Sequence, residues 1–269
     1  MKSLSRIYNI LIFSFLYAPM LVLIVFSFNS SPSRVVWTGF STEWYEKLFQ
    51  NEEILNSLWV TFTIAILATI FSTVIGTLTA IGLRSVNKRL RSVLMAMNNF
   101  PMVNPEIVTG ISLMLLFVFL HESLGWGWLQ PGYVTLLLSH ITFCIPYVVL
   151  QVLPRLRQAN PHLYEAAVDL GCPPIKAFFK VMLPEIMPGV VTGALMAFTM
   201  SLDDFVISLF TSGASAQNLS VTIYAMVKRR VTPEINALST LMFGAVLLLL
   251  ITVNVVQART MAKDSRKKA

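Results

Sequence analysis

The sequence predicts an all-α integral membrane protein with six transmembrane helices. Of its 269 residues, 55% are apolar and only 12% are charged, and the mean hydropathy is +0.70. A soluble domain carries about 25% charged residues, so the composition excludes that class. A spanning helix needs about 20 mostly apolar residues. Six segments approach this length, namely 7–28, 57–83, 93–120, 133–154, 186–211 and 236–258.

The first segment is interpreted as a retained membrane anchor rather than a cleaved signal peptide. Its apolar run exceeds the roughly 7–15 residues of a signal-peptide core, and no small-x-small cleavage site follows it before Asn29. The polar stretch 29–56 then separates the first two spans. Its apolar or aromatic residues at 40, 44, 45, 48 and 49 predict a short amphipathic helix at the membrane surface.

The third segment is predicted to be a broken or kinked helix. Pro101 and Pro105 lie near its start, and a proline inside a helix removes one hydrogen bond and clashes with the preceding turn. Trp126 and Trp128 follow this segment and are typical of anchors at a membrane–water interface. The fourth, fifth and sixth segments are each expected to form one span.

The basic residues predict the orientation of these spans. With the N-terminus inside, 15 of the 20 Lys and Arg residues lie on the inner side. Short loops rich in Lys and Arg face the cytoplasm, so both termini are expected to be cytoplasmic. Three of the remaining basic residues form the outer run Lys228-Arg229-Arg230, which would either face an acidic partner or lie in a solvated loop.

The stretch 155–185, between the fourth and fifth spans, is predicted to form a helix-turn-helix outside the bilayer. Asn160 is followed by proline, and this pair is a good helix start. Gly171 suits the position just after a helix end, and the two prolines after Cys172 stop continuation. The second of these prolines can open another short helix, which is expected to end before Pro184.

The first helix of this stretch has a surface suited to docking. Ala166 and Ala167 are small, so another protein can approach the backbone closely. Glu165 and Asp169 are one turn apart and form a negative edge. A rigid helix held in a groove of a partner could pass a movement to the adjoining spans. The alternative is that the stretch is only an ordered loop.

The spacing of the motif points to a family. Glu165-Ala166-Ala167 is followed after three residues by Gly171, and after nine more by Val-Met-Leu-Pro at 181–184. This pattern resembles the EAA loop of permease subunits in binding-protein-dependent ABC importers, with Val where the family usually has Ile. The resemblance implies the type I ABC importer permease fold. It also implies that Glu165, Ala166, Ala167 and Gly171, together with the negative edge at Asp169, couple the chain to a nucleotide-binding subunit.

Further stretches resemble spermidine/putrescine permeases of the PotC type. They are 105–108, 200–205 and 231–240. The resemblance implies a single permease domain over 1–269 in the bacterial cytoplasmic membrane. It also implies a related permease as sister subunit, two ATP-binding cassette subunits, an external solute-binding protein and contact with membrane lipid, with no nucleic-acid partner. The chain lacks the phosphate loop Gly-x-x-x-x-Gly-Lys-Ser/Thr. No cofactor is therefore expected on this chain, and ATP and Mg would bind at the partner ATPase.

Three acidic residues lie within the predicted spans, at Glu106, Asp203 and Asp204. Each costs about 2.5–3.5 kcal/mol of insertion free energy near the centre of a spanning helix, so each is expected to have a functional or structural role. Adjacent residues on a helix point about 100° apart. One aspartate could line a path while the other caps a helix break. Acids around a water-filled path suit a cationic solute such as a polyamine. The alternatives are protonated acids or acids paired with the sister subunit.

Other groups could assist a cation along this path. Tyr147 and Phe205 are candidate aromatic contacts, although ordinary helix packing explains them as well. The prolines and Asn104 beside Glu106 could expose backbone carbonyl groups, since irregular backbone is tolerated in a membrane where it lines a cavity.

Three classes of function compete, and a transport subunit is favoured. An intramembrane enzyme would need clustered carboxylates or a His/Cys constellation, whereas the three histidines and two cysteines are dispersed. No catalytic residue and no metal site are therefore expected. A channel or stand-alone carrier would need no docking helix. Within transport, an importer for another cationic or small solute is the alternative to polyamine uptake.

Overall fold

The computed structural model describes the chain except residues 1, 32–35, 161, 230–232, 249–250 and 252–269. Contacts divide the chain into two compact units, here called unit 1 (Met1–Leu55 and Ile223–Ala269) and unit 2 (Asn56–Thr222). Among the described residues, five helices are long and apolar enough to cross a membrane. The all-α prediction is therefore confirmed, with five candidate spans.

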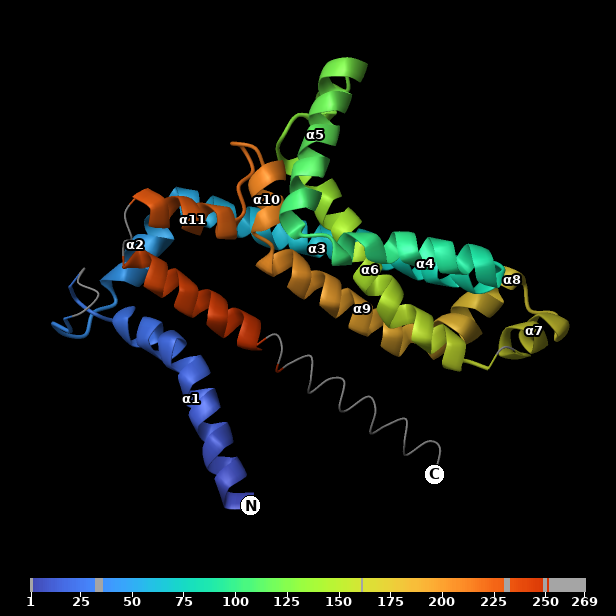
Figure 1. Ribbon diagram of the computed structural model, residues 1–269, viewed down its shortest axis with the longest axis horizontal. Helices are drawn as coiled ribbons and strands as arrows, with labels where there is room; N and C mark the ends of the chain where they lie inside the picture. The colour runs from blue at the N-terminus through green and yellow to red at the C-terminus, as the bar shows by residue number, and fades with distance from the viewer. Residues whose placement is uncertain (1, 32–35, 161, 230–232, 249–250, 252–269) are drawn as a thin grey trace. The chain divides into compact units, whose positions relative to one another are not determined.

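The helices can be followed along the chain in Figure 1. In order they are α1 (Lys2–Phe26), α2 (Glu43–Gln50), α3 (Glu52–Ser85), α4 (Lys88–Val103), α5 (Glu106–Leu124), the 3-10 turn η1 (Gly127–Leu129), α6 (Tyr133–Gln158), α7 (His162–Asp169), α8 (Pro174–Ala177), the π-helical turn η2 (Phe178–Met182), α9 (Leu183–Asp203), α10 (Val206–Thr211), α11 (Leu219–Arg229) and the helix Glu234–Leu248.

In unit 1, α2 is the amphipathic helix that the spacing predicts. Trp44 and Leu48 are buried on one face, and the indole Nε1 of Trp44 donates a hydrogen bond to the Asn29 carbonyl at 2.6 Å. The adjacent face carries an exposed ion pair between Glu43 and Lys47 at 2.6 Å, and the Lys47 ammonium lies 4.6 Å from the centroid of the Trp44 ring. The two faces of this short helix therefore differ as a surface helix requires.

The sixth predicted span, 236–258, is described only in part. The helix Glu234–Leu248 covers its first half, and most of the second half lies outside the described residues. Of the run Lys228-Arg229-Arg230, the first two residues belong to α11, and Arg230 lies outside the described residues. The Lys228 ammonium lies 4.6 Å from the ring centroid of Tyr224, at a distance typical of a cation–π contact.

In unit 2, the third predicted span is interrupted as expected, but its limits were wrong. The segment 93–120 forms two separate helices, α4 and α5, which are divided at Asn104 and Pro105. The spanning helix is α5 alone, and it ends at Leu124. Proline disfavours helical backbone at the residue before it, and Asn104 is accordingly extended, with φ −71° and ψ 141°.

The predicted span 186–211 is divided at the two aspartates, where one of them was expected to cap a helix break. α9 ends at Asp203, and α10 begins at Val206. The extended backbone of Asp204, with φ −65° and ψ 127°, ends the first helix. No proline or glycine marks this position, so the pair of aspartates is the local signal of the break.

Two polar side chains fix the turn between α3 and α4. The Asn87 side chain accepts a hydrogen bond from the Leu90 amide at 2.8 Å and so caps the start of α4. From α4, Arg91 donates to the carbonyl oxygens of Leu83 at 2.7 Å and Arg84 at 2.8 Å. These carbonyls belong to the last turn of α3 and have no partner within that helix.

The core of unit 2 is centred on α6, which lies beside α9 (Figure 1). Glycines allow the close approach. A Cβ atom at Gly189 would lie 2.9 Å from the Gln151 carbonyl oxygen, and one at Gly193 would lie 3.2 Å from the Val148 Cα. Small residues at helix crossings are typical of membrane proteins, because backbone-to-backbone packing is the main attraction between helices in lipid.

The close packing predicts that Gly189→Ala destabilises the protein. The added methyl group would meet α6 at less than 3 Å, and such overpacking costs about 1–3 kcal/mol. Thermal unfolding of the purified protein measures the effect. Gly82→Ala is the matched control, since a Cβ there has nothing within 4 Å. Equal melting temperatures for the two variants would contradict the tight crossing.

Candidate functional site

A small pocket lies at the break between α4 and α5. Its volume is about 40 Å³. Glu106, which is exposed and stands in the first turn of α5, contributes a carboxylate, and the half-buried Tyr147 of α6 contributes a ring. The residues that line the pocket are Pro101, Met102, Asn104, Glu106, Thr109, Phe143, Tyr147 and Ile207.

Two prolines leave a backbone carbonyl group at this pocket without its helical hydrogen-bond donor. Pro105 stands four residues after Pro101 and has no amide hydrogen, so the Pro101 carbonyl lacks its normal helical donor. The hydrogen bond from the Asn104 amide to the Phe100 carbonyl, at 3.1 Å, ends α4. The pocket therefore lies at the carbonyl end of one helix and beside the carboxylate of the next.

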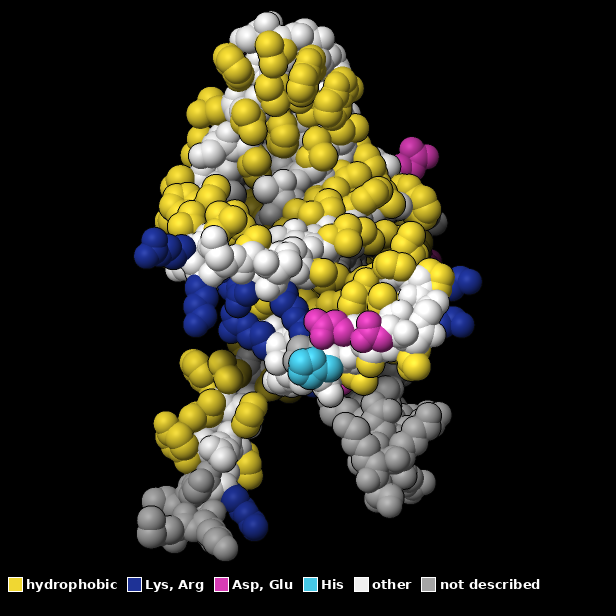
Figure 2. Space-filling model, turned by 90° about the vertical axis from the view of Figure 1, so that its right-hand side faces the viewer, with side chains coloured by type: hydrophobic (Ala, Val, Ile, Leu, Met, Phe, Trp, Pro, Cys, Tyr) yellow, Lys and Arg dark blue, Asp and Glu magenta, His cyan; other side chains and the backbone are white. Residues whose placement is uncertain are grey.

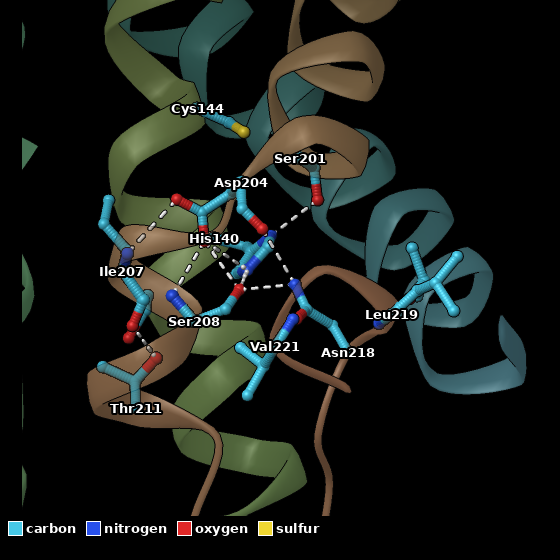
Figure 3. Close-up of polar contacts among 12 residues, drawn as sticks. His140, Cys144, Ser201, Asp204, Ile207, Ser208, Thr211, Asn218, Leu219 and Val221 are labelled. Atoms are coloured by element: carbon cyan, nitrogen blue, oxygen red, sulfur yellow. Dashed lines mark hydrogen bonds and ion pairs between the residues drawn. The ribbon is translucent and has the colours of Figure 1, made fainter. Parts of the chain in front are cut away.

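A second polar site lies at the break between α9 and α10 (Figure 3). The Asp204 carboxylate is buried and caps α10. Its Oδ1 accepts a hydrogen bond from the Ile207 amide at 3.3 Å, and its Oδ2 accepts from the Ser208 amide at 2.8 Å and the Ser208 hydroxyl at 2.6 Å. An aspartate that binds the free amides of a first helical turn is a typical N-terminal cap.

His140, from α6, links both sides of this break. Its Nδ1 lies 2.7 Å from the hydroxyl of Ser201 on α9, and its Nε2 lies 3.0 Å from the hydroxyl of Ser208 on α10. Nε2 also lies 3.5 Å from Oδ2 of Asp204. Since the Ser208 hydroxyl donates to Asp204, it must accept from His140. A neutral ring with hydrogen on Nε2, accepting at Nδ1 from Ser201, satisfies every contact.

Asn218 completes the network. Its Nδ2 donates to the Asp204 carbonyl at 2.9 Å and to the Ser208 hydroxyl at 2.7 Å. The next residue, Leu219, donates its amide to the Thr61 hydroxyl of α3 at 2.8 Å. The network therefore holds the α9–α10 break against α6, the chain before α11, and α3.

The presence of Ser, His and Asp invites comparison with a hydrolytic triad, but the geometry differs. In a triad the histidine contacts the serine with one ring nitrogen and the aspartate with the other. Here Asp204 and Ser208 both lie on the Nε2 side of His140, and the Ser208 hydroxyl donates directly to the carboxylate. Ser201 lies on the Nδ1 side, so the two ring nitrogens are used in the reverse order to a triad. Ser201 is 1% exposed and Ser208 is 0% exposed, so neither hydroxyl is open to a substrate.

The structure separates the five residues predicted to line a solute path. Glu106 and Tyr147 share the pocket at the α4–α5 break. Asp203 is exposed, whereas Phe205 is half-buried at the second break, and neither lines that pocket. Asp204 is buried in the capping network. The two adjacent aspartates thus have different surroundings.

The sequence analysis missed the partners of Asp204. His140, Ser208 and Asn218 lie 64, 4 and 14 residues from it and come from three parts of the fold. Only Ser208 had a local signal, because a serine four residues after a capping aspartate can reach its carboxylate. The hydrogen bonds of His140 give it a structural role, but no spacing rule connects it to Asp204.

A third site is the helix-turn-helix that follows α6. α7 begins where the Asn160 side chain accepts a hydrogen bond from the His162 amide at 3.0 Å. At the other end, the Cys172 amide donates to the Ala167 carbonyl and the Gly171 amide to the Val168 carbonyl. Gly171 has φ +85°. This paired pattern around a left-handed glycine is a Schellman motif.

The second helix of this stretch does not end before Pro184 as expected. α8 continues through the π-helical turn η2 into α9, so that the chain is helical from Pro174 to Asp203. Pro184 is accommodated in the first turn of α9. A π-helical turn changes the hydrogen-bond register locally, which lets a helix continue past a residue that lacks an amide hydrogen.

The outer surface of α7 and its turn combines charge with exposed apolar side chains. Glu165, Ala166 and Asp169 are exposed. Leu170 is 89% exposed and Ile175 is 74% exposed. Figure 2 views this end of unit 2 and shows Lys and Arg side chains gathered in a band beside acidic side chains and a histidine.

A cavity of about 460 Å³ lies behind α7. Arg84 from the end of α3 and Glu185 from the start of α9 both line it, together with Glu165 of α7. The cavity therefore separates the docking candidate from the ends of two spanning helices.

The several helices that are long and apolar enough to cross a membrane define the class as a multi-pass membrane protein, and the family match specifies a transport permease. The chain belongs to the family described as binding-protein-dependent transport system inner membrane component, whose model matches residues 72–263. The chain is thus a permease subunit and not an enzyme.

Two relatives of known function are similar over most of the chain. The putrescine transport system permease protein PotI of Escherichia coli K12 is 43% identical over 235 residues, which are 87% of this chain and 83% of that protein. The spermidine/putrescine transport system permease protein PotC of the same strain is 40% identical over 256 residues, which are 95% of this chain and 92% of that protein.

A solved structure supports the fold. The bacterial ABC transporter that imports the acidic polysaccharide alginate contains a chain that matches with a TM-score of 0.74 and 19% identity. The match covers 95% of this chain and 94% of that chain. A further crystal structure shows the alginate transporter in complex with a pentasaccharide-bound periplasmic protein, and it gives the same TM-score.

The capping network predicts different effects for the two aspartates. Asp204→Asn would place an amide nitrogen or a weaker acceptor where the carboxylate accepts three hydrogen bonds, and leaving buried donors without partners costs about 1–3 kcal/mol. Asp203→Asn, at an exposed position, should change stability by less than about 0.5 kcal/mol. Thermal unfolding of both variants measures this difference. The same loss of stability in both would argue against the capping role.

Proposed function

We propose that this chain is one half of the translocation path of an ATP-driven importer for polyamines such as putrescine and spermidine. The observation that carries the proposal is the similarity to two polyamine permeases over 87% and 95% of the chain. Exposed carboxylates at helix breaks, Glu106 and Asp203, agree with a cationic solute.

The proposed assembly follows from the family. The chain, acting as one permease domain over 1–269, pairs with a related permease and sits on two ATP-binding cassette subunits in the bacterial cytoplasmic membrane. An external binding protein delivers the solute. ATP and Mg bind at the partner ATPase, and the movement that their hydrolysis drives exposes the path to each side in turn.

The proposed orientation places both termini and the segment 155–185 in the cytoplasm. The excess of Lys and Arg in the loops on that side supports it. The helix Glu234–Leu248 would then be the described part of a sixth span over 236–258. With six spans, an even number, both termini lie on the same side of the membrane.

The docking element in this proposal is α7. Its small residues Ala166 and Ala167 would allow close approach of the ATPase subunit, and Glu165 and Asp169 would provide the negative edge. The Schellman turn at Gly171 makes the element rigid, and the exposed side chain of Leu170 would be covered in the complex. The unbroken helix from Pro174 to Asp203 would carry movement into the membrane.

Within the path, we assign the solute-facing role to Glu106 and Asp203, with Tyr147 and Phe205 as candidate aromatic contacts. Asp204, which the sequence made an equal candidate, is better assigned to structure, because its carboxylate already accepts hydrogen bonds from Ile207 and Ser208.

ATP-dependent uptake of labelled putrescine and spermidine tests the function. Vesicles holding this chain with its co-encoded partners should take up polyamine saturably, and excess unlabelled polyamine should compete. A complex that hydrolyses ATP but takes up neither compound would contradict the polyamine assignment. It would point to an importer of another cationic or small solute.

Charge reversal at the docking helix tests the coupling. Glu165→Lys should lower uptake by about tenfold or more, since losing one partner of a buried charged contact costs at least that much, while insertion into the membrane is unchanged. Glu122→Lys, an exposed acid near the far end of α5, is the matched control. Normal uptake and normal ATPase binding by Glu165→Lys would rule out docking through this residue.

A further inference from the structure

We propose that the pocket at the α4–α5 break is a binding site for a single alkylammonium group, which receives one end of the transported polyamine. The pocket is lined by Glu106, Tyr147, Asn104 and Pro101 among others. The proposal rests on the function proposed above and adds the unit of recognition, which is one ammonium group rather than the whole solute.

The backbone at the break favours a cation. The last carbonyl groups of a helix carry a partial negative charge and lack partners within the helix. Three lining residues, Pro101, Met102 and Asn104, lie in or just after the last turn of α4. Because Pro105 has no amide hydrogen, it cannot donate to the Pro101 carbonyl. An ammonium group supplies hydrogen-bond donors to such carbonyls.

The side chains add a charge and two aromatic rings. Glu106 provides a carboxylate at the start of α5, and the Thr109 hydroxyl lies one turn further along the same helix. Phe143 and Tyr147 meet edge to face, with ring centroids 5.8 Å apart and planes at 78°. Both rings line the pocket. Carboxylate, carbonyl and aromatic faces together match an alkylammonium ion, whose charge and adjacent methylene group need different contacts.

The size of the pocket decides how much of the solute it holds. Its volume is about 40 Å³, whereas a site that encloses a whole small molecule has about 300–1,000 Å³. The pocket therefore receives only one end of the solute, and the rest of the alkyl chain must extend outside. The second ammonium group therefore needs another acid. Asp203 is exposed and does not line this pocket, so it is available for that contact.

An uncharged occupant, such as a lipid chain, would fit this pocket less well. A lipid chain in contact with Glu106 would bury its carboxylate without a partner, and an uncompensated charge in apolar surroundings is strongly disfavoured. A lipid chain would likewise leave the Pro101 carbonyl without a hydrogen-bond donor, because Pro105 cannot donate to it. A ligand that carries both a positive charge and hydrogen-bond donors removes both costs.

The test uses the complete complex in lipid nanodiscs and n-butylammonium, which has a single charged end. Thermal stabilisation by n-butylammonium is compared with that by uncharged n-butanol, first in the native complex and then in Glu106→Gln. The control variant is Glu122→Gln, which removes a carboxylate from the same helix away from the pocket. The same three proteins are assayed for the KM of putrescine uptake.

The proposal expects stabilisation by n-butylammonium in the native complex and in Glu122→Gln, and its loss in Glu106→Gln. The KM for putrescine should rise by about tenfold or more in Glu106→Gln, as for the loss of a charged hydrogen bond, with unchanged ATPase activity. Stabilisation of Glu106→Gln equal to that of the control would overturn the site.

The outcomes separate this site from the proposed function. Absence of polyamine uptake by the native complex contradicts the polyamine assignment, whereas the n-butylammonium difference between the two variants still decides the site. Tyr147 gives a second check. Tyr147→Leu should raise the KM by about threefold or more because it loses the ring face, and Tyr147→Phe, which keeps that face, should restore the native value. Failure of the phenylalanine variant to do so would overturn the aromatic contact.

Discussion

Interrupted helices impose the main physical constraint on unit 2. A break in an apolar span exposes amide and carbonyl groups that water cannot reach, and each must find a partner or line a cavity. The chain meets this constraint differently at its two breaks. At the α9–α10 break the Asp204 carboxylate and Asn218 supply the missing partners. At the α4–α5 break a pocket remains beside Glu106.

This difference explains how similar residues come to have different roles. Asp203 and Asp204 are adjacent and chemically identical, yet one is exposed and the other is a buried cap. A buried carboxylate that already accepts several hydrogen bonds has little capacity for a passing cation. The capping network also fixes α10, which packs beside α5 and contributes Ile207 to the pocket wall. The structural site thereby supports the geometry of the proposed binding site.

α7 is joined to α9 by one short turn and a continuous helix. α7 ends in a tight glycine turn, and after α8 the chain stays helical through a π-helical turn to Asp203. Close glycine contacts at Gly189 and Gly193 hold α9 against α6. A continuous and well-packed helix thus connects the turn after α7 with the α9–α10 break.

The sequence by itself determined the features that depend on local chemistry. Apolar length predicted the spans, Pro105 predicted the first break, and Gly171 predicted the turn after α7, because each acts through its own backbone or immediate neighbours. It allowed one of the two adjacent aspartates to cap a second break, but it did not decide which of them does so. The roles of the two aspartates depend on His140 and Asn218, which reach Asp204 only when distant helices pack. The pocket beside Glu106 likewise needs Phe143 and Tyr147 from α6. Tertiary structure decided these features, because hydrogen bonds and pockets between helices depend on which faces meet, and helical periodicity alone does not fix that choice.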